Sequence, residues 1–144
     1  MNKQKGFTII ELIVVIAIIA VLAAIVMVNV TSYINKGKDA AIKGNLSSLM
    51  TNSSVWFDTN STYTGFTANA ITGCGAAGAI ALAITGAGGS LVCAETATTG
   101  AAWCGCSGEK ADTTKYYCVD STGAKVENTT ACTTSCTIAS PSCL

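Results

Sequence analysis

One acidic side chain stands at the start of the longest apolar stretch of the chain. The sequence opens MNKQKGFTIIELIVVIAIIAVLAAIV, and from Leu12 to Val28 no residue is charged or strongly polar. A carboxylate in bilayer hydrocarbon costs about 2.5–3.5 kcal/mol even on lenient insertion scales. Glu11 is therefore a candidate functional residue: either its position is an accident, or it pairs with something inside the membrane.

Cysteines are the second set of reactive side chains, and all eight lie in the C-terminal half: Cys74, Cys93, Cys104, Cys106, Cys118, Cys132, Cys136 and Cys143. An even number in a small, glycine-rich region that follows a membrane-directed N-terminus predicts disulfides formed in an oxidising compartment. The alternative is a zinc site, but the chain has no histidine and no CxxC pair repeats at zinc-ribbon spacing. We expect disulfides and no metal, with the pairing left open.

The remaining polar residues do not suggest an enzyme. Without histidine there is no imidazole base, and no glycine-rich phosphate loop precedes a Lys-Ser/Thr pair. Six carboxylates beyond residue 57 could in principle act as acid and base, although solvated surface positions are the expectation: Asp58, Glu95, Glu109, Asp112, Asp120 and Glu127. We expect neither catalysis nor a cofactor.

Charge also limits the possible partners. Lysine and arginine together number 8, as do aspartate and glutamate, and charged residues make up 11% of the chain. The part beyond residue 57 is mildly acidic, which argues against a strong electrostatic grip on DNA, so no specific nucleic acid partner is predicted. The aromatic residues there and just before it are expected to be core and not a contact surface: Trp56, Trp103, Tyr116 and Tyr117.

The elements that must position Glu11 begin with the apolar run from Phe7 to Val30, which as a helix is long enough to cross a bilayer. Lys3 and Lys5 place its N-terminal side in the cytoplasm by the positive-inside tendency, with the rest of the chain outside. A cleaved secretory signal and a simple anchor are the alternatives. The run is longer than a usual signal core, and neither alternative explains Glu11.

Residues 31–57 are predicted to continue the same helix into water. One apolar stripe recurs at steps of three and four residues: Ile34, Ile42, Leu46, Leu49, Met50 and Trp56/Phe57. Its expected role is to pack against the rest of the chain. Gly37 and Gly44 each cost about 1 kcal/mol relative to alanine in a helix, so bending or local melting is expected there.

Turn residues over 58–66 predict the end of this helix. The stretch AIALAIT (79–85) fits either a strand or a short helix, and residues 73–106 are otherwise undetermined. Residues 116–119 and 124–127 predict a hairpin around Ser121-Thr122-Gly123. The last stretch, ACTTSCTIASPSCL, is expected to be irregular and stapled by its own cysteines. Because large hydrophobic residues are few here, the helix stripe and the disulfides must supply stability.

The stretch KGFTIIELIVVIAIIAVLAAI resembles the N-terminus of type IV pilins and of the pseudopilins of type II secretion systems, over roughly residues 1–57. A short basic leader ending in glycine, then phenylalanine, then glutamate four residues on, precedes an unbroken apolar helix. The resemblance implies that a membrane peptidase cuts between Gly6 and Phe7 and methylates the new N-terminus of Phe7. It also implies that Glu11 neutralises the N-terminal amine of a neighbouring subunit.

The fold that the resemblance implies is the α+β pilin fold, in which a long hydrophobic N-terminal helix packs against a small, loop-rich, disulfide-rich head that contains strands. The expected divisions are a cleaved leader (1–6), a transmembrane and filament-core helix (7–30), its amphipathic continuation (31–57) and an extracellular head (58–144). C-terminal cysteines often close a loop in this family, a role open here to Cys136 and Cys143.

The function implied is structural: a subunit that leaves the membrane and polymerises with identical copies into a surface pilus, with a prepilin peptidase and inner-membrane assembly machinery as partners. The alternatives are a minor pilin or secretion pseudopilin, and a single-pass anchored binding or adhesion module. Pro141 is the only proline, so the helix-kinking proline of many pilins is missing, and no acidic cluster suggests the calcium site of the major pseudopilin. Pilin is thus favoured over pseudopilin. Glycosylation stays open at five Asn-x-Ser/Thr triplets: Asn29, Asn45, Asn52, Asn60 and Asn128.

Overall fold

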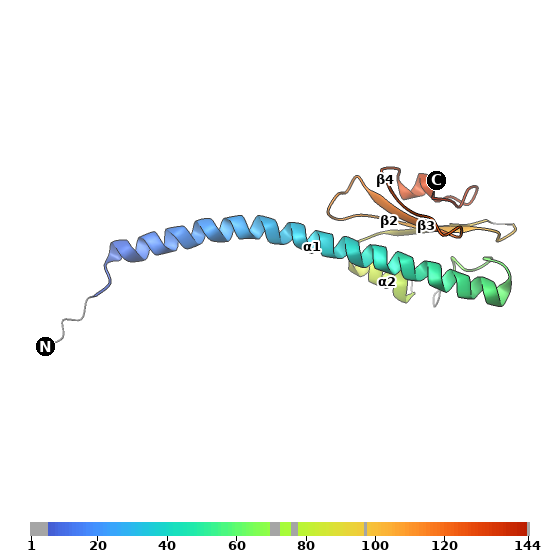
Figure 1. Cartoon of the computed structure of the whole chain (residues 1–144), viewed down its shortest axis with the longest axis horizontal. Coiled ribbons are helices and arrows are strands. Elements are labelled where there is room, and N and C mark those ends of the chain that lie inside the picture. Colours follow the sequence, from blue (N-terminus) through green and yellow to red (C-terminus); the bar gives the residue numbers. More distant parts are fainter. Residues whose placement is uncertain (1–5, 70–72, 76–77, 97, 144) are drawn as a thin grey trace. The chain divides into compact units, whose positions relative to one another are not determined.

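The computed structural model describes residues 6–69, 73–75, 78–96 and 98–143 (Figure 1). The chain divides into two compact units, one that ends at Ile34 and one that begins at Asn35, and each is described by itself. The described residues combine helices with a four-stranded antiparallel sheet. The predicted α+β, pilin-like fold class is confirmed.

Helix α1 (Ile9–Asn60) is a single helix of 52 residues that runs through the boundary of the two units. It ends three residues beyond the predicted position. Its first part is long and apolar enough to cross a membrane. Gly37 and Gly44 lie inside the helix with open space around them, and neither interrupts it.

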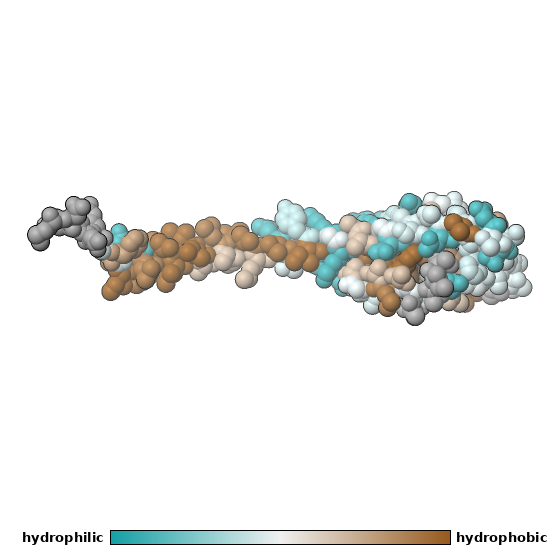
Figure 2. Space-filling view, turned by 90° about the horizontal axis from the view of Figure 1, so that it is seen from below, coloured by the Kyte–Doolittle hydropathy of each residue, from teal (hydrophilic) through white to brown (hydrophobic). Residues whose placement is uncertain are grey.

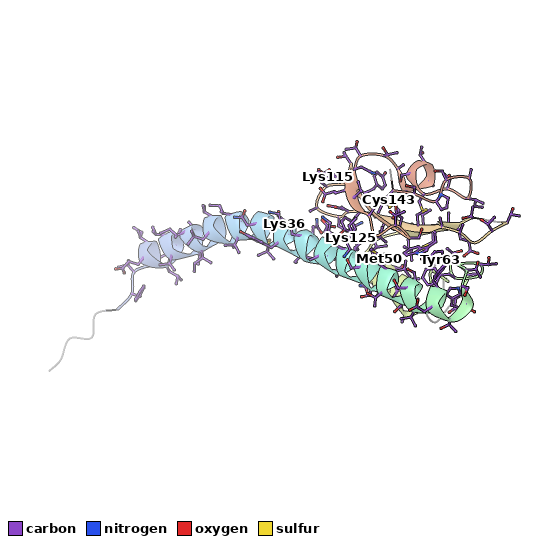
Figure 3. The ribbon with its side chains drawn as sticks, turned by 45° about the vertical axis from the view of Figure 1, so that its right-hand side comes forward. Lys36, Met50, Tyr63, Lys115, Lys125 and Cys143 are labelled. Carbon is purple, nitrogen blue, oxygen red and sulfur yellow. A yellow bond between two sulfur atoms is a disulfide. The ribbon has the colours of Figure 1, made fainter. Side chains whose placement is uncertain are left out.

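The predicted stripe of α1 is correct in its middle and wrong at its ends. Ile42, Leu46 and Leu49 are fully buried in the second unit. Ile34 in the first unit is 52% exposed and Phe57 is 40% exposed. Since consecutive residues point about 100° apart on a helix, Trp56 and Phe57 cannot both face the core. Trp56 packs against it, and Phe57 contacts Tyr63, which is labelled in Figure 3, with ring centroids 4.9 Å apart.

The apolar stretch 79–85, which fitted either a strand or a short helix, forms helix α2 (Ala79–Gly86). It buries Ala81 and Ile84 and leaves Leu82 exposed, so only one face meets the core. Phe66, in the loop after α1, and Ile84 complete the core cluster that the α1 stripe enters.

The sheet consists of β1 (Leu91–Glu95), β2 (Trp103–Gly108), β3 (Tyr116–Asp120) and β4 (Lys125–Asn128), in that spatial order. The predicted hairpin is confirmed by β3 and β4, whose register pairs Tyr117 with Glu127 and Cys118 with Val126. Strands β1 and β2 lie in the region that sequence analysis left undetermined.

Alternation along β2 gives the sheet two different faces. Trp103 is fully buried in the core cluster on the α1 side, with its ring centroid 5.0 Å from that of Phe66. Cys104 and Cys106 point to the opposite face, which the C-terminal segment covers. At Gly105 a Cβ atom would lie 3.0 Å from Cδ2 of Leu49, so α1 packs closely on the sheet at this point.

Four disulfides use all eight cysteines: Cys74–Cys93, Cys104–Cys136, Cys106–Cys132 and Cys118–Cys143. The C-terminal segment, which includes the short helix α3 (Cys132–Ser135), is thereby bonded to β2 and β3. The expectation that this segment is stapled by its own cysteines is wrong, and Cys136 and Cys143 each bond to a strand. The pleat explains this, because alternate residues of β2 and the middle of β3 present sulfur to the same face.

Two carboxylates expected at the surface are buried instead. Asp120 is 1% exposed and Glu109 is 8% exposed. A third, Glu95, is half-buried and accepts hydrogen bonds from the backbone N–H groups of Gly65 and Thr67 at 2.8 and 2.9 Å. Buried carboxylates require partners, and the bonds to Glu95 hold the loop after α1 to the sheet.

Candidate processing and assembly site

Gly6, Phe7 and Thr8 precede α1 in a non-helical conformation. All three are exposed, and Phe7 is 82% exposed. The peptide bond between Gly6 and Phe7 therefore lies outside regular structure, where a protease can bind the backbone.

Thr8 and Glu11 form a capping box at the start of α1. Oε2 of Glu11 accepts hydrogen bonds from the backbone N–H of Thr8 at 2.8 Å and from its hydroxyl at 2.7 Å. In return, the backbone N–H of Glu11 donates to Oγ1 of Thr8 at 3.2 Å. This exchange satisfies N–H groups that a helix start leaves without intrahelical partners. A negative charge in the first turn also complements the helix dipole.

The second carboxylate oxygen of Glu11 is not used in this box. Among the residues that the structure describes, Oε1 of Glu11 accepts no hydrogen bond, since both bonds from Thr8 go to Oε2. The side chain is exposed. Glu11 is thus fixed in place by Thr8 and keeps one oxygen available for a further donor.

The helix that follows presents apolar side chains on every side. From Leu12 to Val26 the large side chains are 46–62% exposed, and Figure 2 shows them as a brown surface over the N-terminal stretch. An open apolar hollow of about 360 Å³ is lined by Val14, Ala17, Ile18, Val21 and Leu22. A helix that is hydrophobic all round is normally buried in lipid or among other helices.

A cluster of charged residues lies in the second unit. The ammonium of Lys43 on α1 lies 2.8 Å from Glu109 and 2.7 Å from Glu127, and Lys115 lies 2.9 Å from Glu127. Burial alone would lower the pKa of Lys43, but the two carboxylates raise it. Lys43 and Lys115 lower the pKa of Glu127 to about 2. These ion pairs tie β4 and the end of β2 to α1, and we assign them a structural role.

The residues predicted to matter for processing and assembly therefore lie together at one helix terminus: Gly6, Phe7 and Glu11. Thr8 was not among the residues predicted from the sequence. The signal was present, because threonine followed three residues later by glutamate, just before an apolar run, is the pattern of a capping box. The eight cysteines all belong to the second unit and contribute nothing to this terminus.

Comparison with known proteins identifies the same terminus. Residues 1–27 match the family model described as the prokaryotic N-terminal methylation motif, which is the class III leader of type IV pilins and pseudopilins. No curated protein and no solved structure matches the chain. The match spans Gly6, Phe7 and Glu11 and ends within α1.

Proposed function

We propose that this chain is the precursor of a filament subunit. A prepilin peptidase removes residues 1–6 and methylates Phe7, and the mature chain polymerises through α1 into a type IV pilus-like surface filament. One observation carries the proposal: the methylation-motif match coincides with an exposed, non-helical Gly6–Phe7 bond directly before an apolar helix without intramolecular cover.

In the assembly step, Glu11 receives the amine of Phe7 from a neighbouring copy. Cleavage creates this amine four residues before Glu11, close to it in depth along the helix, and Oε1 of Glu11 is available to accept from it. Removing one partner from a buried ion pair typically costs about 3–5 kcal/mol, which is enough to select the correct axial register. Repeated head-to-tail contacts between identical subunits then give an open filament.

Before assembly, the first part of α1 holds the subunit in the membrane. Lys3 and Lys5 keep the N-terminus on the cytoplasmic side. The second unit then faces an oxidising compartment, where its four disulfides form and persist. Extraction of the apolar helix from lipid becomes favourable only when other helices replace the lipid around it.

The test is to shear the cell surface, collect the filaments and determine the subunit's N-terminus by mass spectrometry. We expect a polymer whose chains start at N-methylated Phe7. A chain that retains Met1 and occurs only in the membrane fraction, or one trimmed near Ala23, would refute the proposal.

A variant separates processing from assembly. Glu11→Gln keeps an oxygen that can accept from Thr8 but removes the charge, so we expect normal cleavage and membrane levels with a large loss of sheared filament. Asp58→Asn, which removes an exposed carboxylate from the other end of α1, should leave filament yield unchanged. Normal filaments from Glu11→Gln would refute the ion pair while leaving the cleavage step intact.

A further inference from the structure

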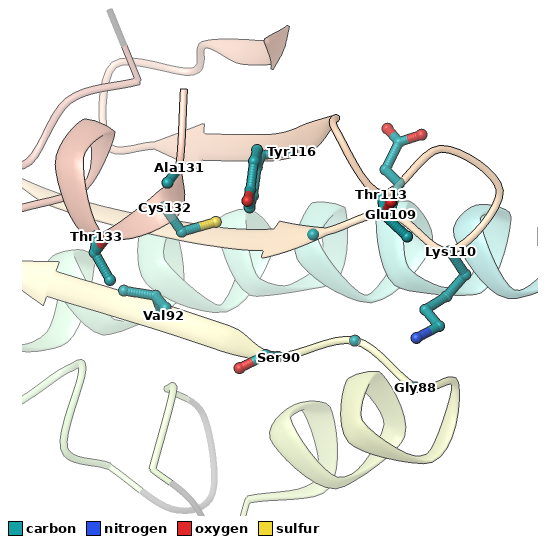
Figure 4. Close-up of a pocket in the computed structure, with 12 residues that line it drawn as sticks. Gly88, Ser90, Val92, Glu109, Lys110, Thr113, Tyr116, Ala131, Cys132 and Thr133 are labelled. Atoms are coloured by element: carbon teal, nitrogen blue, oxygen red, sulfur yellow. The ribbon is translucent and has the colours of Figure 1, made fainter. Parts of the chain in front are cut away.

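A second candidate site lies in the second unit, where the start of β1, the end of β2, the start of β3 and α3 surround an open groove (Figure 4). Its volume is about 360 Å³, within the range of roughly 300–1,000 Å³ that is usual for small-molecule sites. The lining combines one lysine, one glutamate, one aromatic ring and several hydroxyl groups.

Two glycines lie beside the largest lining side chains of the groove. Gly88 has φ of 88°, and a Cβ atom there would lie 3.2 Å from Cε of Lys110. A Cβ atom at Gly108 would lie 3.6 Å from the ring of Tyr116. A side chain at Gly88 would therefore crowd the lysine stem, whereas one at Gly108 would be in ordinary contact with the tyrosine ring.

The charge of the groove comes from Lys110. Its backbone N–H donates to Asp39 on α1, which anchors the residue. Figure 4 shows that the Glu109 carboxylate points away from the Lys110 ammonium, and Glu109 is paired with Lys43 at 2.8 Å. Within the described ranges no carboxylate pairs with the Lys110 ammonium. The groove therefore presents one uncompensated positive charge.

Hydroxyl groups and an apolar floor complete the groove. The hydroxyls of Ser90, Thr113, Tyr116 and Thr133 line it, and none of them bonds to another described residue. The floor includes Val92 and Cys132, which is disulfide-bonded to Cys106. Tyr116 is half-buried, so its ring presents an apolar edge beside polar groups.

We propose that this groove binds an acidic sugar unit, such as a uronic acid in a polysaccharide. The carboxylate pairs with the Lys110 ammonium, the apolar face of the sugar ring packs on Tyr116, and the sugar hydroxyls bond to the lining hydroxyls, which can both donate and accept. A bare inorganic anion can accept from the lysine and from the lining hydroxyls, but it has no apolar face to pack on Tyr116.

This site does not depend on filament formation. In a filament, each subunit would repeat the groove, and many weak contacts to one polysaccharide would act together. The binding itself is testable on the unassembled full-length chain, so a failure of either proposal can be told from a failure of the other.

The experiment is to titrate sugar ligands into the ¹⁵N-labelled, disulfide-intact full chain in detergent micelles and to measure the change of each amide chemical shift. The probe is digalacturonic acid, and its methyl ester and acetate serve as the matched neutral sugar and the plain anion. We expect shifts confined to the amides around Gly88, Gly108 and Lys110, strongest for the acid. Equal shifts with acetate, shifts spread elsewhere, or no shifts would overturn the proposal.

Two variants test the roles of the side chains. Lys110→Gln keeps the backbone bond to Asp39 and should weaken binding roughly two- to fivefold, as expected for a solvent-accessible ion pair. It should also abolish the difference between the acid and its ester. Tyr116→Leu should weaken both sugars alike. Lys125→Gln, on β4 outside the groove, should change neither affinity. An unchanged affinity for the acid in Lys110→Gln, with native spectra, would overturn the assignment.

Discussion

The buried carboxylate of Asp120 bonds to two segments, the turn between β3 and β4 and the C-terminal segment. Oδ1 accepts from the hydroxyl and N–H of Thr122 at 2.6 and 2.9 Å and from the N–H of Ala124 at 3.2 Å. Oδ2 accepts from the N–H of Cys143 at 3.0 Å. Burial would raise the pKa of Asp120, but these four donors together lower it. One side chain thus holds both the β3–β4 turn and the C-terminal segment.

We expect Asp120→Asn to destabilise the second unit by about 1.5–3 kcal/mol, the range for hydrogen bonds to a charged group. The amide can keep its oxygen toward Thr122 only by turning its NH₂ group toward the N–H of Cys143, which leaves two donors facing each other. Urea unfolding of the oxidised protein measures the change. Asp112→Asn, an acceptor only within its own turn, is the control and should have a small effect.

The hydroxyl of Thr8 caps the start of α1. Thr8→Val keeps the shape of the side chain and removes the cap, so we expect the first turn of α1 to lose about 1 kcal/mol. Hydrogen exchange of the Glu11 and Leu12 amides in micelles should become faster. Thr31→Val removes a hydroxyl that bonds to Met27 inside the same helix and should leave those amides unchanged. Exchange rates in Thr8→Val equal to those of the unchanged chain would refute the cap.

At the scale of elements, two glycines have opposite surroundings. Gly44 lies on the exposed side of α1, and a Cβ atom there would have nothing within 4 Å, whereas Gly105 lies where β2 meets Leu49 of α1. The first carries only the entropic disadvantage of glycine in a helix. The second is required by the close packing of the helix on the sheet.

Gly44→Ala should therefore stabilise the unassembled subunit by roughly 0.5–1 kcal/mol, and Gly105→Ala should destabilise it by about 1–3 kcal/mol through overpacking. Thermal unfolding of both variants under oxidising conditions measures the pair. A loss of stability in Gly44→Ala would show that the exposed side of α1 contacts something in the free subunit.

Elements with strong local signals could be predicted from the sequence. The periodic stripe around Leu46 predicted α1, and β-favouring residues on both sides of a glycine turn predicted the β3–β4 hairpin. Strand β2 could not be found in this way, since WCGCSG contains two glycines and no branched residue. It is a strand because its neighbours pair with it on both sides and its two cysteines are bonded to the C-terminal segment.

The candidate site was predictable for a different reason. Gly6, Phe7 and Glu11 are close in the sequence, so a linear motif contains their whole geometry. The disulfides join residues 19 to 32 positions apart, and the bond from Cys143 to Asp120 spans 23. Local patterns carry no information about such contacts. The acidic residues were expected at the surface because carboxylates usually are; only the fold reveals the backbone N–H groups that hold Asp120.

At the scale of the whole molecule, acid should weaken the second unit. The pKa of Glu127 is lowered from 4.5 to about 2 by Lys43 and Lys115, so the folded state favours the ionised form. The stabilisation is complete above about pH 4.5 and is lost as the pH falls toward 2. Asp120 and Asp112 also have lowered pKa values and act in the same direction.

We expect the free energy of unfolding, measured in urea with the disulfides intact, to fall steadily between about pH 5 and pH 2. Glu127→Gln should flatten this dependence and lower stability at neutral pH, because Lys43 and Lys115 lose their shared partner. An unchanged slope in Glu127→Gln would show that other carboxylates, Asp120 first, carry the acid sensitivity.

The positions of the crosslinked residues impose an order on the maturation of the chain. Three of the four disulfides take one cysteine from residues 132–143 and the other from β2 or β3. A ribosome that still holds this segment thus withholds the sulfur partners of both central strands, while only Cys74 and Cys93 have emerged together with their native partner. Three of the four disulfides of the second unit consequently form only after residues 132–143 have emerged. Until then, Cys104, Cys106 and Cys118 are without their native partners and can pair only with one another or with Cys74 and Cys93.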